Sequence, residues 1–183
     1  ILFGSLTAMA YDLKGIDIHG FASQGYLYSD ENNFFSANTK DGTFAYNEVG
    51  VNFSTQPIDD LRIGIQLFSR DLGEMGNNDV TVDWALGDYR VKDWLGIRAG
   101  KIKRPLGLYN DVRDADMART VIFLPQGIYA ENQRDVINAI QGAELYGLLP
   151  LSSAGDLEYQ VFGGTTDIDE TYIVEDAMDQ SAE

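Results

Sequence analysis

The basic residues Arg98, Lys101, Lys103 and Arg104 form a run that no acidic residue interrupts. The chain around this run is strongly acidic, with 13 Lys and Arg residues against 29 Asp and Glu residues and a net charge of −16. A wall lined by clustered cations attracts anionic or carboxylate solutes. The same run also fits a solvated strand end whose lysines extend into water. The sequence leaves both interpretations open.

A long segment of mixed charge, residues 104–138, follows the basic run and has no clear periodicity. An irregular segment of this length is usually functional or disordered, and the aromatic and apolar residues in it argue against disorder. Its charges could pair across a water-filled constriction, or pair locally and only hold the segment in place. The candidate pore-lining and selectivity residues are Arg62, Arg98, Lys101, Lys103, Arg104, Arg113, Asp114, Asp116 and Arg119.

Composition and motifs argue against several functional classes. The chain has no cysteine and one histidine, His19, so disulfide, thiolate-metal and multi-histidine sites are not available within it. The acidic balance argues against nucleic acid as a partner, because phosphate binding needs clustered Lys and Arg. No G-x-S-x-G, P-loop or H-E-x-x-H pattern occurs. We therefore expect no enzymatic activity, no cofactor and no metal.

The elements that must position the charged residues are β-strands, because apolar residues recur at every second position. The clearest cases are Leu61-Ile63-Ile65-Leu67 and Val80-Val82-Trp84-Leu86, each expected to present one apolar face. The pattern predicts an all-β antiparallel meander of about seven strands. Their expected ranges are 16–28, 43–54, 61–68, 80–86, 95–103, 139–149 and 157–165.

Two polar residues fall on faces that this pattern predicts to be apolar. In the strand at 139–149, Ile140, Tyr146 and Leu148 are expected to point outward, and Glu144 shares their parity. Asn47 shares the apolar parity of the strand at 43–54 in the same way. Each residue could lie near an interface, or a β-bulge could shift the register.

The connections between the strands alternate between long and short. Segments 29–42, 70–79 and 104–138 are the longer ones, whereas 56–60, 87–93 and 150–155 are short. In a meander, alternate connections lie on the same side, and this sorting is typical of outer-membrane barrels. A Greek-key sandwich has no reason to sort its loops in this way. The expected strand lengths of about 9–13 residues also fit a tilted bilayer crossing.

Residues 1–10 are apolar or small and end in Ala8-Met9-Ala10, the A-x-A form of a signal-peptidase site. We therefore expect 1–10 to be a residual signal peptide. The alternative is an ordinary apolar first strand. We expect 11–183 to be the N-terminal portion of a larger barrel domain, because single-chain bacterial barrels have even strand numbers.

The stretch from Leu95 to Tyr109, LGIRAGKIKRPLGLY, resembles the "strand, G-K/R-x-K-x-P-x-G-x-Y" segment of Gram-negative porin-like proteins, which include relatives of the phosphate-selective porins. Arg113-Asp114, Phe123-Leu124-Pro125 and the opening Ile18-His19-Gly20-Phe21-Ala22 resemble neighbouring parts of such proteins. The family's phosphate-binding arginines cannot be matched residue by residue, so phosphate selectivity is not implied.

This resemblance implies a transmembrane outer-membrane β-barrel of about 16 strands in the full protein. It implies a homotrimer that passes small hydrophilic or anionic solutes by diffusion. It also implies contact with outer-membrane lipid and lipopolysaccharide at the cell outer membrane of a Gram-negative bacterium.

The main alternative is a soluble or surface-exposed β-sandwich that binds carbohydrate, with Tyr26, Tyr28, Trp84 and Trp94 as its stacking platform. An outer-membrane barrel that acts as an enzyme or adhesin is a third possibility, although no catalytic residues can be named. Burial polarity distinguishes the first two. A barrel exposes its apolar faces and turns its polar faces inward, and a sandwich does the reverse.

Overall fold

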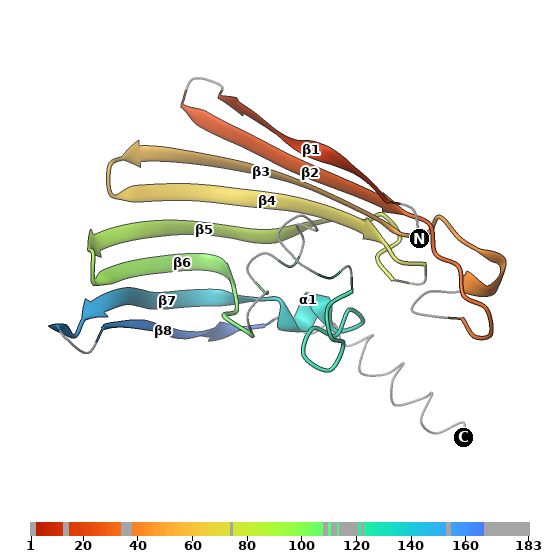
Figure 1. Cartoon of the computed structure of the whole chain (residues 1–183). Helices are drawn as coiled ribbons and strands as arrows, with labels where there is room; N and C mark the ends of the chain where they lie inside the picture. Colours follow the sequence, from red (N-terminus) through yellow and green to blue (C-terminus); the bar gives the residue numbers. More distant parts are fainter. Residues whose placement is uncertain are drawn as a thin grey trace.

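The computed structural model describes residues 3–12, 15–33, 38–73, 75–107, 110, 113, 121, 123–152 and 155–166. They form one antiparallel sheet whose eight strands lie side by side in chain order (Figure 1). The predicted all-β antiparallel meander is therefore confirmed. The strands are β1 (Phe3–Asp12), β2 (Ile16–Gly25), β3 (Asn47–Ile58), β4 (Leu61–Asp71), β5 (Val80–Lys92), β6 (Leu95–Lys103), β7 (Ala139–Pro150) and β8 (Asp156–Thr165).

Helical structure in the described part of the chain consists of two short pieces. They are the 3₁₀ helix η1 (Thr39–Asp41) and the single-turn helix α1 (Arg134–Ile137). No helix among the described residues is long and apolar enough to cross a membrane.

The seven predicted strands correspond to β2–β8, and the sheet contains one more strand, β1. This strand pairs with β2, from Phe3 opposite Gly25 to Asp12 opposite Asp17. It occupies most of the segment 1–10, for which a signal-peptide remnant was expected. A strand at this place is the alternative that the sequence left open, and removal of the segment stays a prediction.

The connections are sorted by length between the two ends of the sheet (Figure 1). The links β1–β2, β3–β4, β5–β6 and β7–β8 are short and lie at one end, here called the turn end. The longer links at 26–46, 72–79 and 104–138 lie at the other end, the loop end. The connections are sorted by length as the sequence predicted. An antiparallel meander sends alternate connections to the same side of the sheet.

The two faces of the sheet differ in polarity because successive side chains in a strand point to opposite faces. One face, here called the apolar face, carries large apolar side chains that are 37% to 64% exposed. The opposite face, the polar face, carries Gln66, Asp83 and Glu144, which are almost fully buried. The apolar-face residues are Ile16, Val49, Ile63, Leu67, Val82, Tyr89, Ile97, Leu145, Leu149, Leu157 and Val161.

A β-bulge in β5 changes which side chains share a face. Val82 lies opposite Leu67 and Trp84 lies opposite Gln66, so Asp83 is an extra residue between them. Asp83 follows Val82 of the apolar face and so points to the polar face, and the bulge re-aims the residues after it. Trp84 points to the polar face as well, where its ring lies over Gly64. The expectation that Val80, Val82, Trp84 and Leu86 share one apolar face was therefore wrong.

The face assignment within β7 also differs from the expectation. Leu145 lies on the apolar face, between Ile97 and Val161 of the neighbouring strands. Glu144 and Tyr146 consequently point to the polar face, and the outward orientation predicted for Ile140, Tyr146 and Leu148 was wrong. No bulge is needed to explain Glu144. Asn47 is the first residue of β3, at the loop end.

Glycines allow the backbones of β5 and β6, and those of β7 and β8, to approach closely toward the loop end. Gly100 lies opposite Gly142, which lies opposite Gly164. A Cβ added to Gly142 would be 2.6 Å from the Cα of Gly164, and one on Gly100 would be 3.0 Å from the Cα of Leu86. Glycine kinks of this kind permit the strong coiling that curved sheets require.

A small hydrophobic core lies at the loop end, where three connections meet. It consists of Leu27, Tyr46 and Leu72, with Met75 and Phe123 packed against it. The rings of Tyr46 and Phe123 meet edge to face at 5.4 Å between centroids, a favourable aromatic geometry. Segment 104–138 thus contacts residues next to β3 and β4, although it connects β6 to β7.

Candidate functional site

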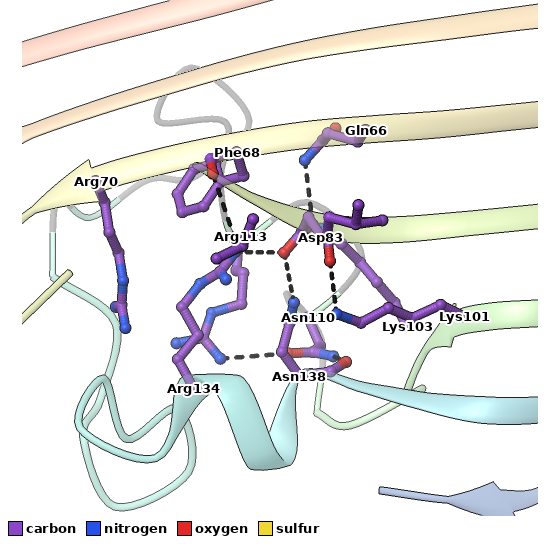
Figure 2. A network of polar contacts seen from close by, with 12 residues as sticks. Gln66, Phe68, Arg70, Asp83, Lys101, Lys103, Asn110, Arg113, Arg134 and Asn138 are labelled. Carbon is purple, nitrogen blue, oxygen red and sulfur yellow. Dashed lines mark hydrogen bonds and ion pairs between the residues drawn. The ribbon is translucent and has the colours of Figure 1, made fainter. Parts of the chain in front are cut away.

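The centre of the candidate site is Asp83, whose side chain is 0% exposed. The described residues at the end of segment 104–138 lie against the polar face at this point, as Figure 2 shows. Lys103 Nζ lies 3.0 Å from Asp83 Oδ2, and Arg134 Nη2 lies 2.7 Å from Oδ1. Asn138 Nδ2 donates to Oδ1 at 2.8 Å, and Gln66 Nε2 donates to Oδ2 at 3.1 Å. These five residues are called the Asp83 cluster.

The Asp83 cluster joins the wall of the sheet to the long segment. Gln66 and Lys103 come from β4 and β6, whereas Arg134 belongs to α1 and Asn138 follows it. The guanidinium of Arg134 also lies over the ring of Phe68, at 4.2 Å from the centroid. A buried carboxylate is stable only when it is paired and hydrogen-bonded, and Asp83 meets both conditions.

A second cluster surrounds Glu131, a residue of the long segment. Arg70 of β4 forms an ion pair with Glu131 Oε2, and its Nη2 donates to the Glu131 backbone oxygen at 3.2 Å. Arg113 Nη2 lies 2.5 Å from Oε1 of the same carboxylate. One carboxylate thus joins the wall to two parts of segment 104–138.

The two ends of segment 104–138 are joined by hydrogen bonds around Asn110. Its Nδ2 donates to the backbone oxygens of Arg104 at 2.7 Å and Asn138 at 3.0 Å. Arg104 Nη2 donates to the backbone oxygen of Val136 at 3.2 Å and to Thr166 Oγ1. These bonds close the base of the segment.

A third group of charges lies on the wall nearer the turn end. Arg98 Nε lies 3.0 Å from Asp88 Oδ2, and Arg98 Nη1 lies 3.2 Å from Glu144 Oε2. The guanidinium lies 4.1 Å from the ring centroid of Tyr146, whose hydroxyl donates to Asp88 Oδ1 at 2.6 Å. Arg62 is opposite Asp88 in the register, so Arg62, Asp88, Arg98 and Glu144 form one row across four strands.

The cations predicted to line a pore have different surroundings. Arg98, Lys103 and Arg113 are paired with carboxylates, and the Nζ of Lys101 donates to the Val82 backbone oxygen at 2.5 Å. Arg62 is exposed on the polar face and makes no ion pair with a described residue. The predicted residues Asp114, Asp116 and Arg119 lie outside the described residues.

The structure bears on the two roles that the sequence left open for the charges of segment 104–138. Arg113, Glu131 and Arg134 pair within the segment or with the wall, and they are mostly buried. These three residues therefore hold the segment in place. Their charges are buried and neutralised by their partners. They therefore act less strongly on a passing solute than the exposed charge of Arg62 does.

The proposed aromatic platform of a sandwich is not assembled. Trp84 lies on the polar face of β5, and Trp94 lies in the β5–β6 connection at the turn end. Tyr26 packs against Phe44 at the loop end, with ring centroids 4.8 Å apart. These residues are distributed over both ends of the sheet.

Sequence reasoning missed the two carboxylates around which the clusters form. The alternation around Asp83 marks it only as a polar position, because a bulge leaves no signal in that alternation. Glu131 was one of many charges in an irregular segment. The parity of Glu144 was a signal, since a carboxylate on an apolar face indicates an incorrect face assignment.

Comparison with protein-family models and with curated proteins found no match. Within the described part of the chain, no group of three or more Asp, Glu or His side chains is arranged to hold a metal ion. The arrangement is a polar wall on which a long segment is held by buried ion pairs.

Proposed function

We propose that this chain forms part of an outer-membrane β-barrel that passes small hydrophilic solutes or ions by diffusion, with segment 104–138 as its constriction. The observation that carries the proposal is the inverted burial of the sheet. Large apolar side chains are exposed on one face, whereas Asp83 and Glu144 are buried on the other. Extended apolar surface of this kind marks contact with lipid or with another protein.

The dimensions of the sheet support a membrane location. Strands β3–β8 contain from 9 to 13 residues, and a tilted transmembrane strand needs about 9–11. Tyr89, Trp94 and Tyr159 lie near the turn end, and the Tyr159 hydroxyl donates to the Trp94 backbone oxygen at 2.6 Å. Aromatic residues at one level of an apolar band are typical of the membrane–water interface.

The open edges of the sheet support a larger barrel. Among the described residues, β1 and β8 each pair on one side only. Unpaired strand edges are unfavourable in lipid, and closure removes them. We propose that further strands, about 16 in all, complete the barrel. On this proposal the barrel is a homotrimer in the outer membrane of a Gram-negative bacterium, with lipid and lipopolysaccharide against the apolar face.

The pairing of the charges supports a channel with weak charge selectivity. The row Arg62, Asp88, Arg98 and Glu144 alternates in sign and sums to zero formal charge. Lys103 and Arg113 are also paired with carboxylates. We propose that small hydrophilic solutes of either sign pass, and that Arg62, an exposed cation on the polar face, attracts anions.

Planar-bilayer recording of the full-length protein tests the channel proposal. A water-filled barrel should give discrete conductance steps whose size rises with salt concentration, because the ions cross in bulk-like water. Heat-unfolded protein at the same concentration is the control. Absence of steps from folded, membrane-inserted protein would overturn the proposal.

A further inference from the structure

Strand β5 places one carboxylate where it faces both the wall and the long segment. Asp83 follows Val82 of the apolar face, so alternation directs it to the polar face, and without the extra residue Trp84 would face the apolar side. With the bulge, both side chains face the polar side, and Asp83 has no solvent exposure. The position is thus built into the backbone of β5.

The four donors to Asp83 are divided equally between the wall and the segment (Figure 2). Gln66 and Lys103 bind from the strands, whereas Arg134 and Asn138 bind from the segment. Lys103 and Arg134 are both cationic and nearly buried, with side-chain exposures of 9% and 4%. The Asp83 carboxylate lies between them and offsets their mutual repulsion.

We infer that Asp83 is a positioning residue that holds segment 104–138 against the wall and so sets the width of the proposed channel. The expected effect on conductance rests on the proposed function. The role of Asp83 in anchoring the segment does not depend on that function. Replacement by asparagine keeps the size of the side chain and removes its charge. The ammonium of Lys103 and the guanidinium of Arg134 then repel each other, and α1 moves away from the wall.

Asp88 offers a matched control on the same strand. Its carboxylate also faces the polar side and pairs with a cation of β6, Arg98, and it accepts a hydrogen bond from Tyr146. Both partners belong to the wall. Asp88→Asn therefore removes a wall charge whose described partners, Arg98 and Tyr146, both lie outside segment 104–138.

The first measurement is limited trypsin digestion of the folded full-length protein, with cleavage within residues 104–138 as the readout. Trypsin cleaves after Lys and Arg, and this segment carries Arg113, Arg119 and Arg134. Asp83→Asn should speed this cleavage by about tenfold over wild type, because local opening becomes more frequent. Asp88→Asn should leave it unchanged. Equal cleavage of the two variants would overturn the inference.

The second measurement is single-channel conductance. Asp83→Asn should raise the conductance by about half or more, or make it fluctuate between levels, because the segment is no longer held against the wall. Asp88→Asn should keep a single steady level. If the wild type does not conduct, the proposed function fails, and the digestion result still decides whether Asp83 anchors the segment.

If the Asp83→Asn variant does not fold, a substitution in segment 104–138 provides the test instead. Arg134→Gln leaves the wall intact and removes the charged tie from α1. It should raise conductance, and cleavage after Arg113 and Arg119, in the same direction as Asp83→Asn, whereas Gln133→Ala, an exposed neighbour, should alter neither. If Arg134→Gln matches wild type in both measurements, Asp83 does not position the segment through its charge.

Discussion

Arg98 occupies the middle of an alternating row of charges on the polar face. It lies between the carboxylates of Asp88 and Glu144, and the Glu144 side chain is 2% exposed. A buried carboxylate without its partner would be strongly unfavourable, so each charge in the row depends on its neighbours. Arg62 extends the row in register but remains exposed. The row is neutral as a whole, although its outer member can still attract an ion.

Opposite changes in this row should shift ion selectivity in opposite directions. Arg62→Gln leaves the row with a net negative charge and should lower the ratio of anion to cation permeability by about twofold. Asp88→Asn leaves the row net positive and should raise the ratio. Reversal potentials across a salt gradient measure the ratio.

A change far from the row is the control for this selectivity prediction. Lys40→Gln removes an exposed cation from η1, in the β2–β3 connection, and should have a smaller effect than Arg62→Gln. Shifts of the same sign for Arg62→Gln and Asp88→Asn would remove the row from any role in selectivity.

The sequence predicted part of the candidate site. The basic run pointed to Arg98 and Lys103, which are central to two of the charge clusters. It did not indicate their partners, because Asp88, Glu144 and Asp83 lie on other strands, and Asp83 lies at a bulge. Pairing across strands depends on register, and alternation alone does not determine which residues are opposite each other.

At the scale of the strands, curvature depends on glycines that face one another. Gly142 has almost no room for a side chain, because an added Cβ would lie 2.6 Å from the Cα of Gly164. Gly163 is adjacent in sequence to Gly164, yet an added Cβ there would meet nothing within 4 Å. Neighbouring glycines thus differ in whether the fold requires them.

This difference predicts a difference in stability. Gly142→Ala should lower the free energy of unfolding by about 1–3 kcal/mol, since the backbones of β7 and β8 must move apart. Gly163→Ala should change it by less than about 0.5 kcal/mol or raise it slightly, because alanine restricts the unfolded chain. Denaturant unfolding of the full-length protein in lipid vesicles measures both. Equal losses would mean that the close approach does not determine stability.

The elements themselves were largely predictable. Period-two alternation identified β2–β8, and the lengths of the connections predicted their sorting between the two ends. The face of Tyr146 and the bulge at Asp83 were not predictable, because apolar residues occur on both sides of β5 and β7. Tyr146 faces a guanidinium and Trp84 covers a glycine, so an aromatic side chain did not identify the apolar face.

At the scale of the whole molecule, the sheet has one polar face and one apolar face. The exposed apolar residues extend from β2 to β8, whereas the polar face is partly covered by segment 104–138. Each buried large apolar side chain stabilises a fold by about 1.5–3 kcal/mol. Leaving so many large apolar side chains in water would be unfavourable, and a lipid environment would remove this cost.

Val161 and Phe162 provide the most direct test, because they are adjacent on β8 and point to opposite faces. They are 64% and 44% exposed, and lie opposite Leu145 and Glu144 respectively. The chain has no cysteine, so Val161→Cys and Phe162→Cys each give a single site for a fluorophore.

The measurement is fluorescence quenching of each labelled full-length protein in vesicles, by spin-labelled lipid and by aqueous iodide. The proposed barrel predicts that lipid quenches the label at position 161 and iodide quenches the label at 162. Quenching of both labels by iodide alone, or the reverse assignment, would contradict a lipid-facing apolar surface around a water-filled channel.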